Sequence, residues 1–443
     1  MPAHRMSQGH TLVFLIAVLI GSAPAQAPPK YKVLQSLDGA PWGGVMLDPS
    51  GNVYGTTAGG GSGNCRYGCG TVFELSPLPG GNWVFSVLYD FTGGTDGEAP
   101  YGTLVVDASD NIYGTTTSGG QYNAGTAFEL VAGPDSWTET TIYAFCPKIG
   151  KSGCEDGGGT QAGLAWDQEG NLYGTKSGGG TVGGEIFELA PGSGGWSEAI
   201  LHRFQPSYYR HPAPGGSNPY AGLILDASGN LYGTTAEGGA NCSGWSCGVV
   251  YELTRKSGGG WKEIVLHRFH SDGKDGVTPG WGALFMDGSG SLYGTTRGGG
   301  VNECGGGPDP PDGPRAGQPL KAIGNCGTIF RLTKAVDGRW KETILYSFKS
   351  GSTGSSPNTG LVMDRSGTLY GTTDYGGSSS GCGVIYKLAP HPKGKWEYTV
   401  LHSFTGNDGC LPEGNLVLDQ KGNLYGGTVL GGGGYGVIFE LTP

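Results

Sequence analysis

The sequence has little charge and no long apolar run. Asp, Glu, Lys and Arg make up only 14% of its 443 residues, and 37 acidic residues stand against 27 basic ones. No basic stripe is present to follow a phosphate backbone, which argues against nucleic acid as a partner. The apolar stretch at residues 11–20 is about half as long as a membrane-spanning helix of roughly 20 residues. We therefore expect no membrane span in the mature chain.

The first 25 residues instead have the features of a secretory signal peptide. Arg5 precedes the apolar stretch, and Ala23-x-Ala25 suits cleavage before Gln26. An uncleaved membrane anchor is the less favoured interpretation because the apolar stretch is short. The pattern predicts a protein secreted to the periplasm or the extracellular space, with residues 26–443 forming one domain that we expect to be a monomer.

Glycine is unusually abundant, with 91 residues. A strict Gly-X-Y triplet is absent, which excludes collagen. Aromatic and β-branched residues recur along the whole chain, which argues against disorder. The remaining explanation is a fold with many tight turns.

A repeat supplies those turns. Its centre reads Asp-x-x-[Gly/Asp]-x-[Val/Ile/Leu]-Tyr-Gly, and the aspartate ends a short apolar run typical of a buried strand. Asp and Gly then favour a turn, and the segment that begins with Tyr-Gly forms the antiparallel second strand. The repeat tyrosines are Tyr54, Tyr113, Tyr173, Tyr232, Tyr293, Tyr370 and Tyr425, and the aspartates six residues earlier are Asp48, Asp107, Asp167, Asp226, Asp287, Asp364 and Asp419.

Two more strands complete each unit. A Gly-x-x-[Phe/Tyr]-x-Leu segment predicts strand three, and a segment that starts with Trp in six units predicts strand four. The last unit stops at Pro443 without its fourth strand, whereas residues 31–37 match the end of one. The sequence therefore predicts an all-β, seven-bladed β-propeller with four-stranded blades, in which the N-terminal strand completes the last blade.

Ten cysteines in an exported chain predict disulfides. Their grouping along the sequence pairs Cys65 with Cys69, Cys146 with Cys154, Cys242 with Cys247, Cys304 with Cys326, and Cys382 with Cys410. Zinc is the less favoured alternative because the pairs lie far apart and lack histidines nearby. In an antiparallel blade, the connections that carry these cysteines emerge on one face, where we expect any ligand site.

The motif Gly-Asn-Leu-Tyr-Gly-Thr-Thr, followed by Gly-Thr-Val-Phe-Glu-Leu, resembles the GloVer (Gloeo-Verruco) tandem-repeat family of exported bacterial proteins over about residues 30–443. The resemblance implies the repeat fold and export but no particular activity. A more distant similarity to NHL and lactonase-like propellers supports the fold and transfers no catalytic residue.

Acidic side chains are the first candidate site. An Asp-Gly pair ahead of strand one occurs at Asp38, Asp96, Asp156, Asp275 and Asp408. If these loops converge on the central channel, their carboxylates could bind Ca²⁺, although no cofactor is required. The simpler interpretation is that Asp-Gly shapes a turn. His202, His267 and His402 replace a strand-four tyrosine in separate blades, and we expect packing residues there.

Aromatic and basic residues on the loops form the second candidate site. They are Tyr208, Tyr209, Arg210, His211, Trp245, Trp281 and Arg297. Such side chains on exposed loops suit contact with a glycan or a protein partner. Our first hypothesis is therefore a non-enzymatic binding propeller. The alternative is a hydrolase or lactonase-like enzyme with a divalent cation at the channel mouth.

Overall fold

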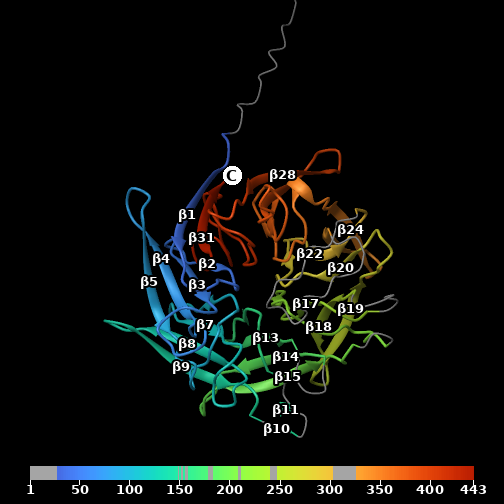
Figure 1. The fold of residues 1–443 in the computed structure, drawn as a ribbon. Coiled ribbons are helices and arrows are strands. Elements are labelled where there is room, and N and C mark those ends of the chain that lie inside the picture. Colours follow the sequence, from blue (N-terminus) through green and yellow to red (C-terminus); the bar gives the residue numbers. More distant parts are fainter. Residues whose placement is uncertain are drawn as a thin grey trace, which may run out of the picture.

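The strands of the protein form a ring of seven antiparallel sheets around a central axis (Figure 1). The computed structural model describes residues 27–147, 149–150, 153–154, 158–177, 183–207, 211–239, 247–302 and 326–443. The ring confirms the predicted seven-bladed β-propeller. The expected signal segment lies outside the described ranges. Within those ranges, no helix has the length and apolar character needed to cross a membrane.

Each of the first four blades runs from an innermost strand outward through three antiparallel neighbours. The first blade contains β2 (Val45–Leu47), β3 (Val53–Thr57), β4 (Thr71–Pro77) and β5 (Trp83–Asp90), and the second contains β6 (Val105–Val106), β7 (Ile112–Thr115), β8 (Thr126–Ala132) and β9 (Trp137–Ala144). The third contains β12 (Ala165–Trp166), β13 (Leu172–Lys176), β14 (Glu185–Ala190) and β15 (Ser197–Arg203), and the fourth contains β16 (Ile224–Leu225), β17 (Leu231–Thr235), β18 (Val249–Arg255) and β19 (Trp261–Arg268).

The last three blades follow the same order. The fifth contains β21 (Phe285–Met286), β22 (Leu292–Gly299), β23 (Thr328–Lys334) and β24 (Trp340–Ser347), and the sixth contains β25 (Val362–Met363), β26 (Leu369–Thr373), β27 (Val384–Pro390) and β28 (Trp396–Ser403). The seventh contains β29 (Val417–Leu418), β30 (Leu424–Thr428), β31 (Val437–Thr442) and β1 (Lys30–Ser36). Four described elements lie outside the repeat. They are β20 (Gly276–Pro279), which pairs with β22, the two strands of a hairpin, β10 (Ile149–Gly150) and β11 (Gly153–Cys154), and the 3-10 turn η1 (Gly351–Thr353).

The two ends of the chain meet in the seventh blade. β1 pairs antiparallel with β31 from Lys30 opposite Thr442 to Ser36 opposite Val437, and Figure 1 shows the blue strand beside the red one. Tyr31 stacks on His402 of the sixth blade, with ring centroids 3.8 Å apart. The Tyr31 hydroxyl also donates a hydrogen bond to the Asp408 carbonyl at 2.6 Å. The N-terminal strand therefore completes the last blade, as predicted.

The glycine of each Tyr-Gly pair leaves room for an aromatic ring. This glycine lies directly across from the aromatic residue of strand three in every blade, for example Gly55 opposite Phe73. A Cβ atom on Gly55 would lie 2.5 Å from the Phe73 ring, closer than any side chain tolerates. The pairs are Gly55 and Phe73, Gly114 and Phe128, Gly174 and Phe187, Gly233 and Tyr251, Gly294 and Phe330, Gly371 and Tyr386, and Gly426 and Phe439.

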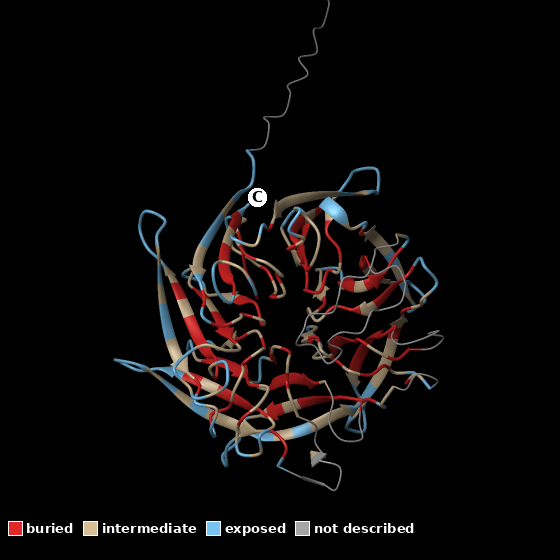
Figure 2. Cartoon of the chain, in the orientation of Figure 1, coloured by how far each residue is buried: buried red, intermediate tan, exposed pale blue. Residues whose placement is uncertain are grey.

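The same strand-three aromatics join one blade to the next. A phenylalanine that follows strand four packs edge-on against the strand-three ring of the following blade, as Phe91 does on Phe128 at 5.1 Å. This contact recurs at six seams, and Leu37 takes the place of the phenylalanine at the seventh, against the first blade. Figure 2 shows the result, with buried strands inside the ring and exposed loops at its edge.

The repeat aspartate and tyrosine hold the turn between strands one and two. Asp226 accepts hydrogen bonds from the amides of Ser228 and Asn230 and from the Asn230 side chain at 2.8 to 2.9 Å. The Tyr232 hydroxyl lies 3.1 Å from Asp226 and 3.2 Å from Glu252 of strand three. Burial alone would raise the pKa of Asp226, but these hydrogen bonds hold it below its ordinary value. The motif thus serves the fold of each blade.

Disulfides occur in the connections that emerge on one face of the ring, which we call the loop face. Cys65–Cys69, Cys146–Cys154 and Cys382–Cys410 are bonded as predicted. Cys247 and Cys326 are also in disulfides, whereas their expected partners Cys242 and Cys304 lie outside the described residues.

Candidate functional site

One position of the repeat faces the channel and carries different side chains in different blades. It lies six residues before the repeat aspartate, just ahead of strand one. We call it the ring position, and its residues are Trp42, Tyr101, Gln161, Tyr220, Trp281, Asn358 and Glu413. A small residue follows each, which lets neighbouring backbones touch. A Cβ atom on Gly282 would lie only 1.6 Å from the Gly360 amide nitrogen, so a larger residue there would force the blades apart.

The ring-position side chains line a cavity at the channel mouth. All of them except Asn358 border one cavity of about 220 Å³, together with Asn415 and Thr103. Trp42 and Tyr101 stack with ring centroids 5.6 Å apart, and Tyr220 and Trp281 lie at 5.4 Å. Flat aromatic faces with a few convergent polar groups in a concave site are typical of small-molecule binding.

An arginine and two acids form a polar cluster beside this cavity. The Arg297 guanidinium carbon lies 5.9 Å from the Trp281 ring centroid, and Arg297 Nη2 lies 3.8 Å from Asp374 Oδ2. Arg297 and Asp374 occupy the same repeat position, four residues after the repeat tyrosine, in adjacent blades. Glu413 is part of the cavity wall.

The two acids of this cluster resist ionisation. Asp374 is only 1% exposed, and within the described chain neither of its carboxylate oxygens accepts a hydrogen bond. Burial raises the pKa of Asp374 well above its ordinary value, and the nearby charge of Glu413 raises it further. Burial also raises the pKa of Glu413 to about 7, although Arg297 opposes this shift. Both shifts favour the protonated form of these carboxyl groups.

The structure brings together two of the loop residues predicted as ligand contacts. Trp281 and Arg297 meet at the channel mouth. His211 is exposed and does not border the cavity. The other four candidates, Tyr208, Tyr209, Arg210 and Trp245, lie outside the described residues.

The four described Asp-Gly carboxylates do not border the channel cavity. Asp96, Asp275 and Asp408 contact strand-four side chains at the outer rim, namely Tyr89 at 3.1 Å, His267 at 3.2 Å and His402 at 2.9 Å. Asp38 follows β1 and lies 3.4 Å from the Gly61 amide, and none of the four borders the cavity. Asp156 lies outside the described residues. Strand four is outermost, so the first residues of the connection after it are still at the rim.

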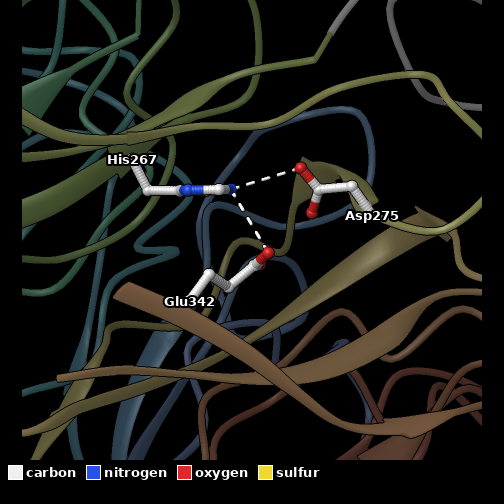
Figure 3. Close-up of side chains that lie close together, drawn as sticks. All are labelled: His267, Asp275 and Glu342. Atoms are coloured by element: carbon white, nitrogen blue, oxygen red, sulfur yellow. Dashed lines mark hydrogen bonds and ion pairs between the residues drawn. The ribbon is translucent and has the colours of Figure 1, made fainter. Parts of the chain in front are cut away.

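The strand-four histidines, expected to be packing residues, each face a carboxylate. His202 lies 3.5 Å from Glu263, and His402 pairs with Asp408. His267 lies between two acids, 3.2 Å from Asp275 and 3.5 Å from Glu342, with the three side chains pointing toward one another (Figure 3). Burial and the charge of Asp275 raise the pKa of Glu342 well above its ordinary value. The three histidines belong to different seams and do not form a shared site.

Sequence reasoning missed most of the cavity. Trp42, Tyr101, Tyr220, Asp374 and Glu413 were not among the predicted site residues. A signal was present, because the residue six positions before a constant aspartate varies between tryptophan, tyrosine, amide and acid, whereas the residue three positions before that aspartate is always leucine or valine.

The closed ring, the shared repeat and the variable channel mouth define a repeat-built β-propeller with a cavity on its axis. The family model described as the Gloeobacter/Verrucomicrobia repeat matches residues 26–215 and 320–443, and the chain belongs to this family. This confirms the resemblance seen in the repeat motif.

Solved structures with a similar fold have low sequence identity to the chain. A proposed 6-phosphogluconolactonase from Bacteroides uniformis is 13% identical with a TM-score of 0.46, and the match covers 80% of this chain and 83% of that one. A proposed oxidoreductase (glucose dehydrogenase) from Thermus thermophilus is 15% identical with a TM-score of 0.39, covering 94% and 100%. No curated protein matches the sequence. We draw nothing on activity from these likenesses.

Proposed function

We propose that this protein is an exported, non-enzymatic propeller that binds a glycan at the channel mouth of its disulfide-bearing face. The observation that carries the proposal is the presence of two aromatic pairs on the wall of one cavity, with Trp42 stacked on Tyr101 and Tyr220 tilted against Trp281. Aromatic faces pack against the C–H faces of sugar rings, and Gln161 and Asn415 supply groups for the hydroxyls.

The cavity also limits the size of the ligand. Its volume of about 220 Å³ is below the roughly 300 to 1,000 Å³ of sites for drug-sized molecules. A terminal sugar unit suits this space better than an internal stretch of a polysaccharide. Export is supported by the three described disulfides, which form and persist in oxidising compartments.

A glycan array followed by calorimetry on the best ligand tests the proposal. Trp281→Ala and Tyr101→Ala should each weaken binding by about 30-fold or more, as expected for a buried aromatic contact worth roughly 2 kcal/mol. Tyr435→Ala is the matched control because Tyr435 is 54% exposed in a loop and does not border the cavity. A glycan that binds Trp281→Ala and Tyr101→Ala as tightly as the original protein would contradict the assignment.

Catalysis is the second candidate function, and the acids Asp374 and Glu413 favour it. A carboxyl group that keeps its proton near pH 7, beside a second carboxyl group, is the arrangement used for acid-base cleavage of glycosidic bonds. Incubating each bound glycan with the protein, with and without a chelator, distinguishes the two functions. Binding without any product supports the binding propeller. Product formation that Glu413→Gln abolishes supports a hydrolase.

A further inference from the structure

The seam between the fourth and fifth blades brings three metal-ligating side chains together at the rim (Figure 3). His267 is on β19, Asp275 directly precedes β20, and Glu342 is on β24. The Nε2 atom of His267 lies 3.2 Å from Asp275 Oδ2 and 3.5 Å from Glu342 Oε2. All three ligand atoms lie within 4.8 Å of one another. This cluster is separate from the channel mouth.

These separations match the geometry of a bound metal ion. Zinc bonds of about 2.0 to 2.1 Å place the ligand atoms of a tetrahedron about 3.3 to 3.4 Å apart. An ion therefore fits between the three side chains with only small shifts. The side chains are 18%, 9% and 14% exposed for His267, Asp275 and Glu342, so water can reach the fourth position. One imidazole and two carboxylates suit a divalent first-row metal, and the two carboxylates balance its charge.

Other seams of the ring show that packing does not require this combination. We number each seam by the first of the two blades that it joins. At the first seam, between the first and second blades, the same positions hold Tyr89, Asp96 and Glu139, with a phenol in place of the imidazole. At the sixth seam His402 and Asp408 remain, but Tyr31 replaces the glutamate and stacks on the histidine. Among the described residues, only the fourth seam combines histidine, aspartate and glutamate.

The second carboxylate oxygen of Glu342 also lacks a hydrogen-bond donor. Glu342 Oε1 is buried and accepts no hydrogen bond from any described residue, and the same holds for Glu263 Oε1, which faces His202 at the seam between the third and fourth blades. At the sixth seam, by contrast, Asp408 accepts hydrogen bonds from Thr405 as well as His402, so its carboxylate is satisfied without an ion. A buried carboxylate oxygen without a donor is costly unless a cation or a water molecule serves it.

We propose that His267, Asp275 and Glu342 bind one Zn²⁺ ion, with water as the fourth ligand. The ion ties β19 of the fourth blade to β20 and β24 of the fifth. It therefore fastens one seam of the ring and is independent of the glycan cavity.

The test uses the mature protein without a histidine tag, stripped of metal with a chelator and titrated with ZnCl₂ by calorimetry. We expect one ion per chain. His267→Gln and Glu342→Gln, which preserve side-chain size and hydrogen bonding, should each weaken binding by about 100-fold or more, the upper end of losses measured for groups that support a metal site. His402→Gln is the matched control and should leave Zn²⁺ affinity unchanged. Circular dichroism checks that each variant is folded.

A gain-of-site variant makes the test sharper. Tyr89→His places an imidazole beside Asp96 and Glu139 and so completes the same set at the first seam. We expect this variant to bind two ions per chain, and Tyr89→Phe to bind one. Absence of saturable Zn²⁺ binding by the original protein, or binding unchanged in both His267→Gln and Glu342→Gln, overturns the proposal. A single ion in Tyr89→His overturns the claim that these three side chains suffice.

Discussion

Tyr31 is the side chain through which the N-terminal strand holds the ring closed. It stacks on His402 at 3.8 Å and packs at 5.8 Å and 5.5 Å from the rings of Phe404 and Phe439. Its hydroxyl donates to the Asp408 carbonyl. Replacing Tyr31 therefore tests whether closure depends on side-chain contacts or on the β1 to β31 hydrogen bonds alone.

The expected cost follows from these contacts. A fully buried aromatic residue replaced by alanine costs about 3 to 5 kcal/mol, and partial burial places Tyr31→Ala near the lower end, about 3 kcal/mol. Tyr31→Phe removes only the hydrogen bond, about 1 kcal/mol. Unfolding entropy of roughly 2.1 cal/mol/K per residue makes the melting temperature of so large a ring fall by only about 1 °C per kcal/mol.

Hydrogen exchange is therefore the better assay. Detachment of β1 exposes the amides of β31, so Tyr31→Ala should speed exchange in Val437–Thr442 by about 100-fold, and Tyr31→Phe by about 5-fold. Val33→Ala is the control because Val33 lies on the same strand and is 36% exposed. If Tyr31→Ala exchanges no faster than Val33→Ala, the side-chain account of closure is wrong.

Three further predictions concern the rest of the ring. Replacing both cysteines of Cys382–Cys410, which are 28 residues apart, should lower the free energy of unfolding in urea by about 3.5 kcal/mol. Replacing both cysteines of Cys65–Cys69, which are 4 residues apart, should lower it by about 2 kcal/mol. The difference arises because the longer loop gains more chain entropy when the protein unfolds. Gly294→Ala forces a Cβ atom to 2.5 Å from Phe330 and should cost about 1 to 3 kcal/mol, whereas Gly288→Ala, with open space around it, should cost less than about 1 kcal/mol. The pKa of Glu413 rises from 4.5 to about 7 on folding, so its contribution to stability is present below pH 4.5 and lost as pH rises through 7. Glu413→Gln should flatten this part of the stability profile, and an unchanged slope would contradict the buried acid.

The sequence was sufficient to predict the scaffold because every blade repeats the same local chemistry. The Asp-to-Tyr spacing marks strands one and two, and the Gly-x-x-[Phe/Tyr] segment marks strand three. Residues 31–37 resemble the fourth strand that the last unit lacks, which predicts how the ring closes. These features act within one blade or between the ends of the chain, so a single sequence reveals them.

The candidate site depends on contacts between blades, and those are harder to foresee. Arg297, Asp374 and Glu413 come from the fifth, sixth and seventh units and meet only through the packing of neighbouring blades around the axis. Asp275 was a candidate channel ligand only on the condition that its loop reaches the channel, and a role in shaping the turn was the favoured interpretation. Asp275 lies at the rim instead, since the connection reaches the channel only in its second half, at the ring position.

The residue at the ring position differs between blades, whereas the four-stranded blade is the same throughout. Six of its seven residues border the cavity, and none of these six lies within a described strand. Exchanging these residues in combination would give a library of cavities on an unaltered framework. The protein is in this sense a ready template for selecting new specificities, with one randomised codon per blade.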